Sequence, residues 1–180
     1  MNMTCTENVT PHFAHLPKLK VGDYLEFDGE LIVMRDAAQN RLLELKLKGQ
    51  DFPVNLRGKI VFYAGPTFAN GRMIIGPTTS KRMDKYLQML LENGVIATVG
   101  KGTRSEHARE LIRKFKAPYF VAPSGCAAYL STCVVSWEVL TFEDLGPEAI
   151  YRVEVKKFPL VVYIDASGNV YRPFGGADGI

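Results

Sequence analysis

The fold is decided by the stretch from Met73 to Gly100, which has the sequence MIIGPTTSKRMDKYLQMLLENGVIATVG. Its first three residues have strand character, and a helix is predicted after Gly76-Pro77-Thr78-Thr79 because apolar side chains then recur at helical spacing. These side chains are Met83, Tyr86, Leu87, Leu90 and Leu91. Asn93-Gly94 ends the helix, and residues 95–99 have the composition of a buried strand. A strand, a helix and a strand in succession predict an α/β fold with parallel pairing.

The pattern continues on both sides of this stretch. After it, Thr103 and Glu106 have capping-box spacing, and the predicted elements are a helix to Phe115, a strand at 119–122, a short helix at 125–133, strands at 134–141, 150–155 and 160–164, and a turn at 165–169. Before it, Asp28-Gly29 between residues 24–27 and 31–34 predicts a hairpin, Asp36 is predicted to cap a helix, and residues 59–63 form a strand. We therefore expect one mixed α/β domain, with a central, largely parallel sheet and an antiparallel β portion.

Composition excludes several classes of protein. The 180 residues suit one domain, with an N-terminal arm at 1–20, the folded domain at 21–172 and a tail at 173–180. The net charge of +3 comes from 22 basic and 19 acidic residues mixed along the chain, which argues against a nucleic-acid partner. The longest apolar run, 158–164, is too short to cross a membrane, and no signal peptide is recognisable, so we expect a cytoplasmic protein.

Two glycine-rich junctions are suited to binding an anion. Thr78 and Thr79 precede a helix start, where we expect free backbone N–H groups, and Arg82 is placed to reach back over the same turn. The alternative is a threonine helix cap beside a solvent-exposed arginine. Lys101, between two glycines, follows the next strand and should lie at the same sheet edge, although it could equally be a solvated lysine in a turn. Arg35, at the end of another strand, could face the same crevice or water.

A metal site is not indicated. Cys5, Cys126 and Cys133 have none of the spacings typical of a metal or iron-sulfur centre, and no CxxC pair occurs. A reducing compartment would keep all three cysteines as thiols.

Short motifs along most of the chain occur in the order found in one family. They are Arg35-Asp36-Ala37-Ala38, Tyr63-Ala64-Gly65-Pro66, GPTTSKRMD at 76–84, Gly100-Lys101-Gly102, PSGCAA at 123–128, LGPEAI at 145–150, FPLVV at 158–162 and DASGN at 165–169. Together they resemble the C-terminal domain, or separate beta subunit, of class I fumarases and of the related L(+)-tartrate dehydratases. Two departures from the family pattern are Gln39, where many relatives have histidine, and Ser80-Lys81.

The resemblance implies a swivelling β/β/α domain that closes on a larger alpha subunit, with α2β2 stoichiometry. It implies that the alpha subunit, and not this chain, holds a 4Fe-4S iron-sulfur cluster, whose iron acts as a Lewis acid in adding water to a dicarboxylate or removing it. By motif position, Arg35, Thr79 and Arg82 are predicted to bind substrate. Thr78 and Lys101 are predicted to be catalytic, with Thr78 transferring a proton.

Within the family the substrate is open between two dicarboxylates. GPEAI at 146–150 and Phe158-Pro159 favour hydration of fumarate to L-malate, which we prefer, whereas Ser80 and PSGC at 123–126 favour L(+)-tartrate. A different class of function is a non-catalytic dicarboxylate-binding or regulatory module that uses the same fold.

Overall fold

The computed structural model describes residues 16–172, which form a mixed α/β domain as predicted. Its strands are β1 (Tyr24–Val33), β2 (Ile60–Phe62), β3 (Thr67–Ala69), β4 (Arg72–Ile74), β5 (Ala97–Gly100), β6 (Tyr119–Val121), β7 (Val134–Thr141) and β8 (Ile150–Ile164). Its α-helices are α1 (Asp36–Leu47), α2 (Asp84–Glu92), α3 (Glu106–Phe115) and α4 (Ala127–Thr132), and its 3-10 helices are η1 (Leu16–Lys18), η2 (Ser80–Met83) and η3 (Glu143–Glu148).

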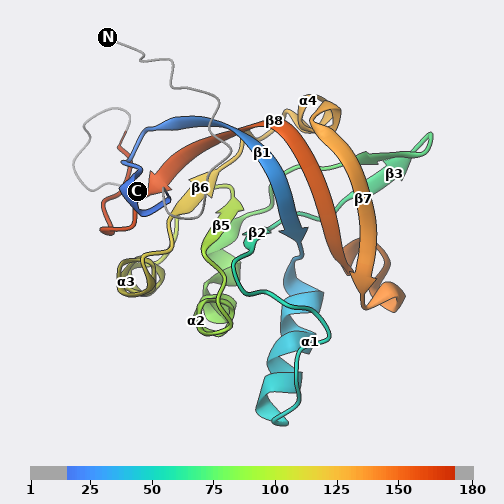
Figure 1. The fold of residues 1–180 in the computed structure, drawn as a ribbon, viewed down its shortest axis with the longest axis horizontal. Coiled ribbons are helices and arrows are strands. Elements are labelled where there is room, and N and C mark those ends of the chain that lie inside the picture. Colours follow the sequence, from blue (N-terminus) through green and yellow to red (C-terminus); the bar gives the residue numbers. More distant parts are fainter. Residues whose placement is uncertain (1–15, 173–180) are drawn as a thin grey trace.

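The main sheet closes on itself. Its strand order is β1-β2-β5-β6-β8-β7, and β8 also pairs with β1, so that β1, β2, β5, β6 and β8 form a ring with β7 as an extension (Figure 1). The pairings of β1 with β2, β2 with β5, and β5 with β6 are parallel. Those that involve β8 are antiparallel. Because β1, β2, β5 and β6 run in the same direction, their carboxyl ends and the loops that follow them share one edge.

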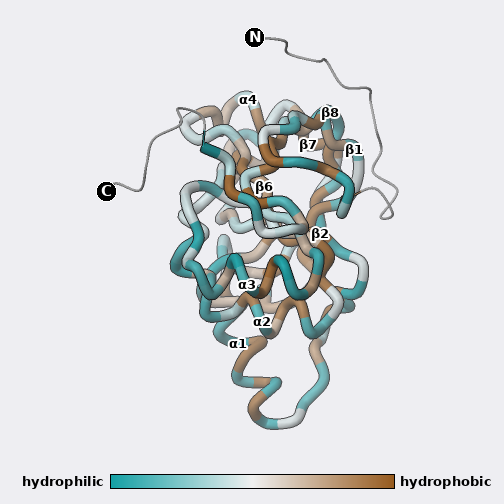
Figure 2. The backbone as a smooth tube through the Cα atoms, turned by 90° about the vertical axis from the view of Figure 1, so that its left-hand side faces the viewer, coloured by the Kyte–Doolittle hydropathy of each residue, from teal (hydrophilic) through white to brown (hydrophobic). Residues whose placement is uncertain are grey.

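Apolar clusters hold the layers together. The largest joins the inner faces of the ring strands and includes Phe62, Phe120 and Phe158, which are fully buried. Helices α1, α2 and α3 lie together on one side of the strands (Figure 1), where Leu42 and Met83 belong to a second cluster. Hydrophobic and hydrophilic stretches alternate along α2 and α3 (Figure 2), as expected for helices that bury one face. This packing holds α1 and α2 beside the shared edge of the sheet.

Strand β1 corrects the hairpin predicted around Asp28-Gly29. The ten residues of β1 form a single strand that pairs with β8 on both sides of this dipeptide. The register shifts between Phe27 and Gly29, where Lys157 of β8 has a φ of +52° and donates its backbone N–H to Asp28 Oδ1 at 2.6 Å. The dipeptide therefore lies at a β-bulge, because the long partner strand continues past the point where a turn was expected.

Strand β8 joins the two strands predicted at 150–155 and 160–164 into one strand of 15 residues. On one side it pairs with β7 as far as Val155 and with β6 from Val161 onward. Pro159 lies between these two stretches, where that side of the strand exchanges partners and a missing N–H group costs least. One strand thus links the parallel and antiparallel parts of the sheet.

Three predictions about individual elements are wrong. Strand β4 does not enter the main sheet, and pairs only with β3. Arg35 and not Asp36 occupies the N-cap position of α1, and Ser105 caps α3 in place of Thr103, with its Oγ accepting a hydrogen bond from Ala108 N at 3.2 Å. At both helix starts, a neighbouring residue takes the N-cap position that the local pattern assigns to Asp36 or Thr103.

The predicted arm at 1–20 and tail at 173–180 lie mostly or wholly outside the described residues. Of the arm, Leu16–Lys18 form η1, and Leu16 is buried in the core of the domain. None of the helices within 16–172 is long and apolar enough to cross a membrane.

Candidate functional site

Two loops lie side by side at the edge where the parallel strands end. Thr78 donates its backbone N–H to Tyr63 O at 2.8 Å, Lys101 donates to Thr78 O at 3.1 Å, and Ser80 donates to Lys101 O at 3.0 Å. Thr79 and Lys101 are therefore neighbours in a short parallel bridge. The loop that carries Thr78 reaches this edge from the β3–β4 hairpin, and not from a parallel strand as the sequence predicted.

These backbone hydrogen bonds use two of the N–H groups that the sequence predicted to be free near the helix start. The N–H groups of Thr78 and Ser80 are already used within the protein. Thr79 occupies the N-cap position of η2, yet its side chain makes no capping hydrogen bond. The threonine cap that was the alternative interpretation of this junction is therefore not formed.

Arg82 folds back over its own turn, as the spacing predicted. Its Nη2 donates to Thr78 Oγ1 at 2.7 Å and lies 3.1 Å from Asp36 Oδ2. The guanidinium can only donate, so the Thr78 oxygen is the acceptor and its own proton points elsewhere. The side chain of Arg82 is 48% exposed, which leaves its other donors accessible to a ligand.

Arg35 approaches the same carboxylate from the end of β1. Its Nη2 lies 2.9 Å from Glu148 Oε1, and its Nε lies 3.8 Å from Asp36 Oδ2. A Cβ at position 65 would lie 2.6 Å from Arg35 Nη1, so Gly65 is required for the guanidinium to lie against this loop. We call Arg35, Asp36, Arg82 and Glu148 the arginine network, in which two carboxylates hold two neighbouring cations.

Lys101 reaches the edge with an uncommitted side chain. It is half-buried, and its ammonium makes no hydrogen bond or ion pair to any other residue within 16–172. The structure thus brings together five of the predicted site residues: Thr78, Thr79 and Lys101 through backbone bonds, and Arg82 and Arg35 through Asp36.

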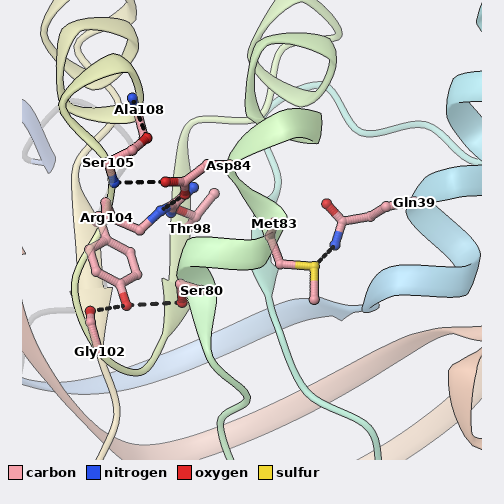
Figure 3. Close-up of polar contacts among 10 residues, drawn as sticks. Gln39, Ser80, Met83, Asp84, Thr98, Gly102, Arg104, Ser105 and Ala108 are labelled. Atoms are coloured by element: carbon pink, nitrogen blue, oxygen red, sulfur yellow. Dashed lines mark hydrogen bonds and ion pairs between the residues drawn. The ribbon is translucent and has the colours of Figure 1, made fainter.

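A second group of polar residues lies beneath the two loops, and the sequence did not indicate it (Figure 3). The Arg104 side chain is fully buried and forms an ion pair with Asp84, which also accepts a hydrogen bond from Ser105 N at 2.7 Å. The Arg104 guanidinium lies 4.9 Å from the centre of the Tyr119 ring. Tyr119 in turn bonds to Ser80, and we call Ser80, Asp84, Arg104 and Tyr119 the buried cluster.

Gly100 is the residue in the sequence from which the buried cluster could have been inferred. A Cβ there would lie 1.9 Å from Ser80 Oγ, so the end of β5 must be glycine for the serine to be buried against it. Asp84 also closes the GPTTSKRMD motif, but its partner Arg104 is 20 residues away, and neither residue shows from its local pattern that it is buried.

The two cysteines within 16–172 are free thiols in different environments. Cys126 is exposed and Cys133 is buried, and burial raises the pKa of the Cys133 thiol. Cys5 lies outside the described residues. Between residues 16 and 172 no group of three or more His, Cys, Asp or Glu side chains could hold a metal ion.

This chain is similar in sequence to known proteins of one family. The family model for the fumarase C-terminus matches residues 6–172. The L(+)-tartrate dehydratase subunit beta of Escherichia coli K12 is 39% identical over 162 residues, which is 86% of this chain and 79% of that protein. A putative L(+)-tartrate dehydratase subunit beta of Methanocaldococcus jannaschii is 34% identical over 161 residues, or 84% of this chain and 83% of that protein.

A longer relative shares the same region. The aerobic class I fumarate hydratase of E. coli K12 is 33% identical over 163 residues, which is 87% of this chain but only 29% of that enzyme. The resemblance expected from the motifs is thereby confirmed. Because the family model and these relatives all match nearly the whole chain, the chain belongs to the fumarase C-terminus family.

Proposed function

We propose that this chain is the beta subunit of a hydro-lyase and supplies half of an active site for a four-carbon dicarboxylate. The observation that carries the proposal is the convergence of Arg35 and Arg82 on Asp36, next to the edge where the loops of Thr78 and Lys101 are paired. Two neighbouring arginines with unused donors suit an oxyanion such as a carboxylate. The known relatives named above are hydro-lyases or their subunits, which supports the same class of reaction.

The arginines are proposed to hold a substrate carboxylate. Asp36 and Glu148 hold the two guanidinium groups close together at the site, in partly exposed pairs that can exchange partners when substrate arrives. Thr79, exposed beside them, is proposed to contribute its hydroxyl to the same carboxylate.

Thr78 and Lys101 are proposed to serve the proton transfer of the reaction. A threonine hydroxyl is a weak acid or base by itself, and it needs nearby positive charge to accommodate a negative oxygen. The hydrogen bond from Arg82 supports this role, because it places a cationic donor 2.7 Å from the Thr78 oxygen. Lys101, whose ammonium has no partner among residues 16–172, is proposed to stabilise charge that develops on substrate.

An alpha-type partner subunit is proposed to complete the site. The relatives covered along most of their length are named as beta subunits, and the resemblance implies a cluster-bearing alpha chain in an α2β2 complex. The described residues of this chain do not fit a 4Fe-4S cluster, since they offer no group of three ligands. We therefore assign the cluster to the partner, and propose that this domain swivels against that partner in the cytoplasm.

Fumarate and L-malate are the proposed substrate pair, on the strength of the GPEAI motif at 146–150 and Phe158-Pro159. L(+)-tartrate is the second candidate. It is favoured by the greater identity to tartrate dehydratase beta subunits, 39% against 33% for the class I fumarase.

The test is an anaerobic assay of this chain combined with the cluster-loaded alpha-type chain from the same source, supplied separately with fumarate, L-malate and L(+)-tartrate. We expect turnover of fumarate and L-malate to exceed that of tartrate. Preferential dehydration of tartrate would reassign the substrate and keep the reaction class. Binding of dicarboxylates without any turnover would favour the non-catalytic module instead.

A further inference from the structure

Tyr119 lies where the two loops of the site are closest. It begins strand β6, its side chain is fully buried, and its hydroxyl is 2.9 Å from Ser80 Oγ and 2.9 Å from Gly102 O. Ser80 follows Thr78 and Thr79, whereas Gly102 follows Lys101. A single hydroxyl thus contacts the residue next to each proposed catalytic segment (Figure 3).

The direction of the two hydrogen bonds follows from their chemistry. The Gly102 carbonyl can only accept, so the one proton of the phenol is donated to it. The Ser80 hydroxyl must then donate its own proton to the Tyr119 oxygen. The bond to Gly102 exists only while the phenol keeps its proton, and burial raises the pKa of Tyr119 well above its ordinary value, so the phenol is protonated at physiological pH.

The surroundings leave these groups little freedom to move. Ser80 is fully buried, and a Cβ at position 100 would overlap its hydroxyl. On the other side, the buried Arg104 guanidinium lies 4.9 Å from the centre of the Tyr119 ring and is held by Asp84. The tyrosine hydroxyl is therefore a fixed point between the loops.

We propose that Tyr119 is a positioning residue of the hydro-lyase site, which sets the spacing between the Thr78–Thr79 loop and Lys101 through Ser80 and Gly102. The inference rests on the proposed function of those loops. The arginine network has its own anchors in Asp36 and Glu148, so Tyr119 governs the proton-transfer groups more than the carboxylate-binding groups. Loss of its hydroxyl should lower kcat and leave KM nearly unchanged.

The test is Tyr119→Phe in the complete complex with its alpha-type partner, since phenylalanine keeps the ring and removes only the hydroxyl. We expect kcat to fall about 10-fold with KM within about twofold, because small displacements of reacting groups are costly. Ser80→Ala should lower kcat in the same direction, and adding it to Tyr119→Phe should have little further effect, since both changes break one link. A wild-type kcat in Tyr119→Phe would overturn the proposal.

Tyr163→Phe is the matched control. Its ring packs edge-on against Tyr119 with centroids 5.9 Å apart, yet its hydroxyl makes no hydrogen bond to another residue within 16–172. We expect normal kinetics from it, and an equal loss of kcat in both variants would contradict a specific role for the Tyr119 hydroxyl.

A second readout does not depend on activity. In the full-length chain alone, amide hydrogen exchange at Ser80 and Lys101 should be faster in Tyr119→Phe than in wild type or Tyr163→Phe. Unchanged exchange would sink the proposal even in an active enzyme. If the wild-type complex showed no hydro-lyase turnover, the proposed function would fail, while the exchange rates would still decide whether Tyr119 ties the loops together.

Discussion

The arginine network and the buried cluster both rely on ion pairs between arginine and a carboxylate, but in opposite environments. The side chains of Arg35 and Arg82 are 32% and 48% exposed, whereas those of Arg104 and Asp84 are 0% and 10% exposed. Exposed pairs contribute little to stability and remain free to exchange partners, while a buried pair cannot lose one member without leaving a charge unpaired. The comparison teaches that residues proposed to meet substrate are kept adjustable and that the residues beneath them are fixed.

The largest expected effect is on stability, from Arg104→Ala. Removing the guanidinium leaves Asp84 buried without its cation, and we expect the free energy of unfolding to fall by about 4 kcal/mol. Urea denaturation of the isolated chain measures this loss. Arg41→Ala is the control, because the pair of Arg41 with Asp144 is exposed, and it should leave the free energy of unfolding nearly unchanged. Similar losses of unfolding free energy in the two variants would contradict the distinction between buried and exposed ion pairs.

The next effect is on activity, from Arg82→Ala. We expect kcat/KM of the complete complex to fall roughly 100-fold, because the proposed charge-assisted contact to substrate is lost. This change corresponds to a loss of about 3 kcal/mol in transition-state stabilisation. Steady-state kinetics measures this change. The free energy of unfolding should change by no more than about 0.5 kcal/mol, as for other exposed pairs. Near-normal kinetics would exclude Arg82 from the site.

A smaller effect should appear at alkaline pH. Burial raises the pKa of Tyr119 above that of the unfolded chain, so the folded state retains the proton longer. The stability that this proton confers is fully present below about pH 10 and declines above it, by about 1.4 kcal/mol per pH unit. Above pH 10, the free energy of unfolding should therefore fall less steeply with pH for Tyr119→Phe than for wild type. Denaturation at several pH values measures this dependence. Parallel curves would show that the phenol titrates normally.

The smallest effect is expected from Asp36→Asn. This change removes the carboxylate that both arginines of the network contact, but the pairs are partly exposed and are worth no more than about 1 kcal/mol. KM should rise by no more than about fivefold, in line with that energy, while kcat stays close to wild type. Steady-state kinetics with Arg41→Ala as the control measures the difference. A collapse of kcat would mean that Asp36 takes part in the chemistry itself.

The sequence predicted the helices and most strands because their signals are local. Apolar side chains at helical spacing identified α2 and α3, and the short apolar run at 119–122 identified β6. It failed where pairing over long distances decides the structure. Asp28-Gly29 has the composition of a turn, but β8 pairs across it. Residues 150–155 and 160–164 are predicted as separate strands, but both belong to β8, which exchanges partners around Pro159.

The candidate site was predicted in part for the same reason. Arg82 and Thr78 are four residues apart, so their contact could be inferred from one helical turn. Glu148 lies more than 100 residues from Arg35, and Arg104 is separated from Asp84 by a helix and a strand. No local pattern pairs such residues, and only the closed sheet brings them together.

The most direct test of a half-site is to measure fumarate hydration by this chain alone, by the cluster-loaded alpha-type chain alone, and by the two mixed under anaerobic conditions. We predict turnover only in the mixture, since this chain is proposed to contribute the arginines, Thr78 and Lys101, and residues 16–172 contain no group of three or more metal-ligating side chains. Turnover by this chain alone would contradict the central claim.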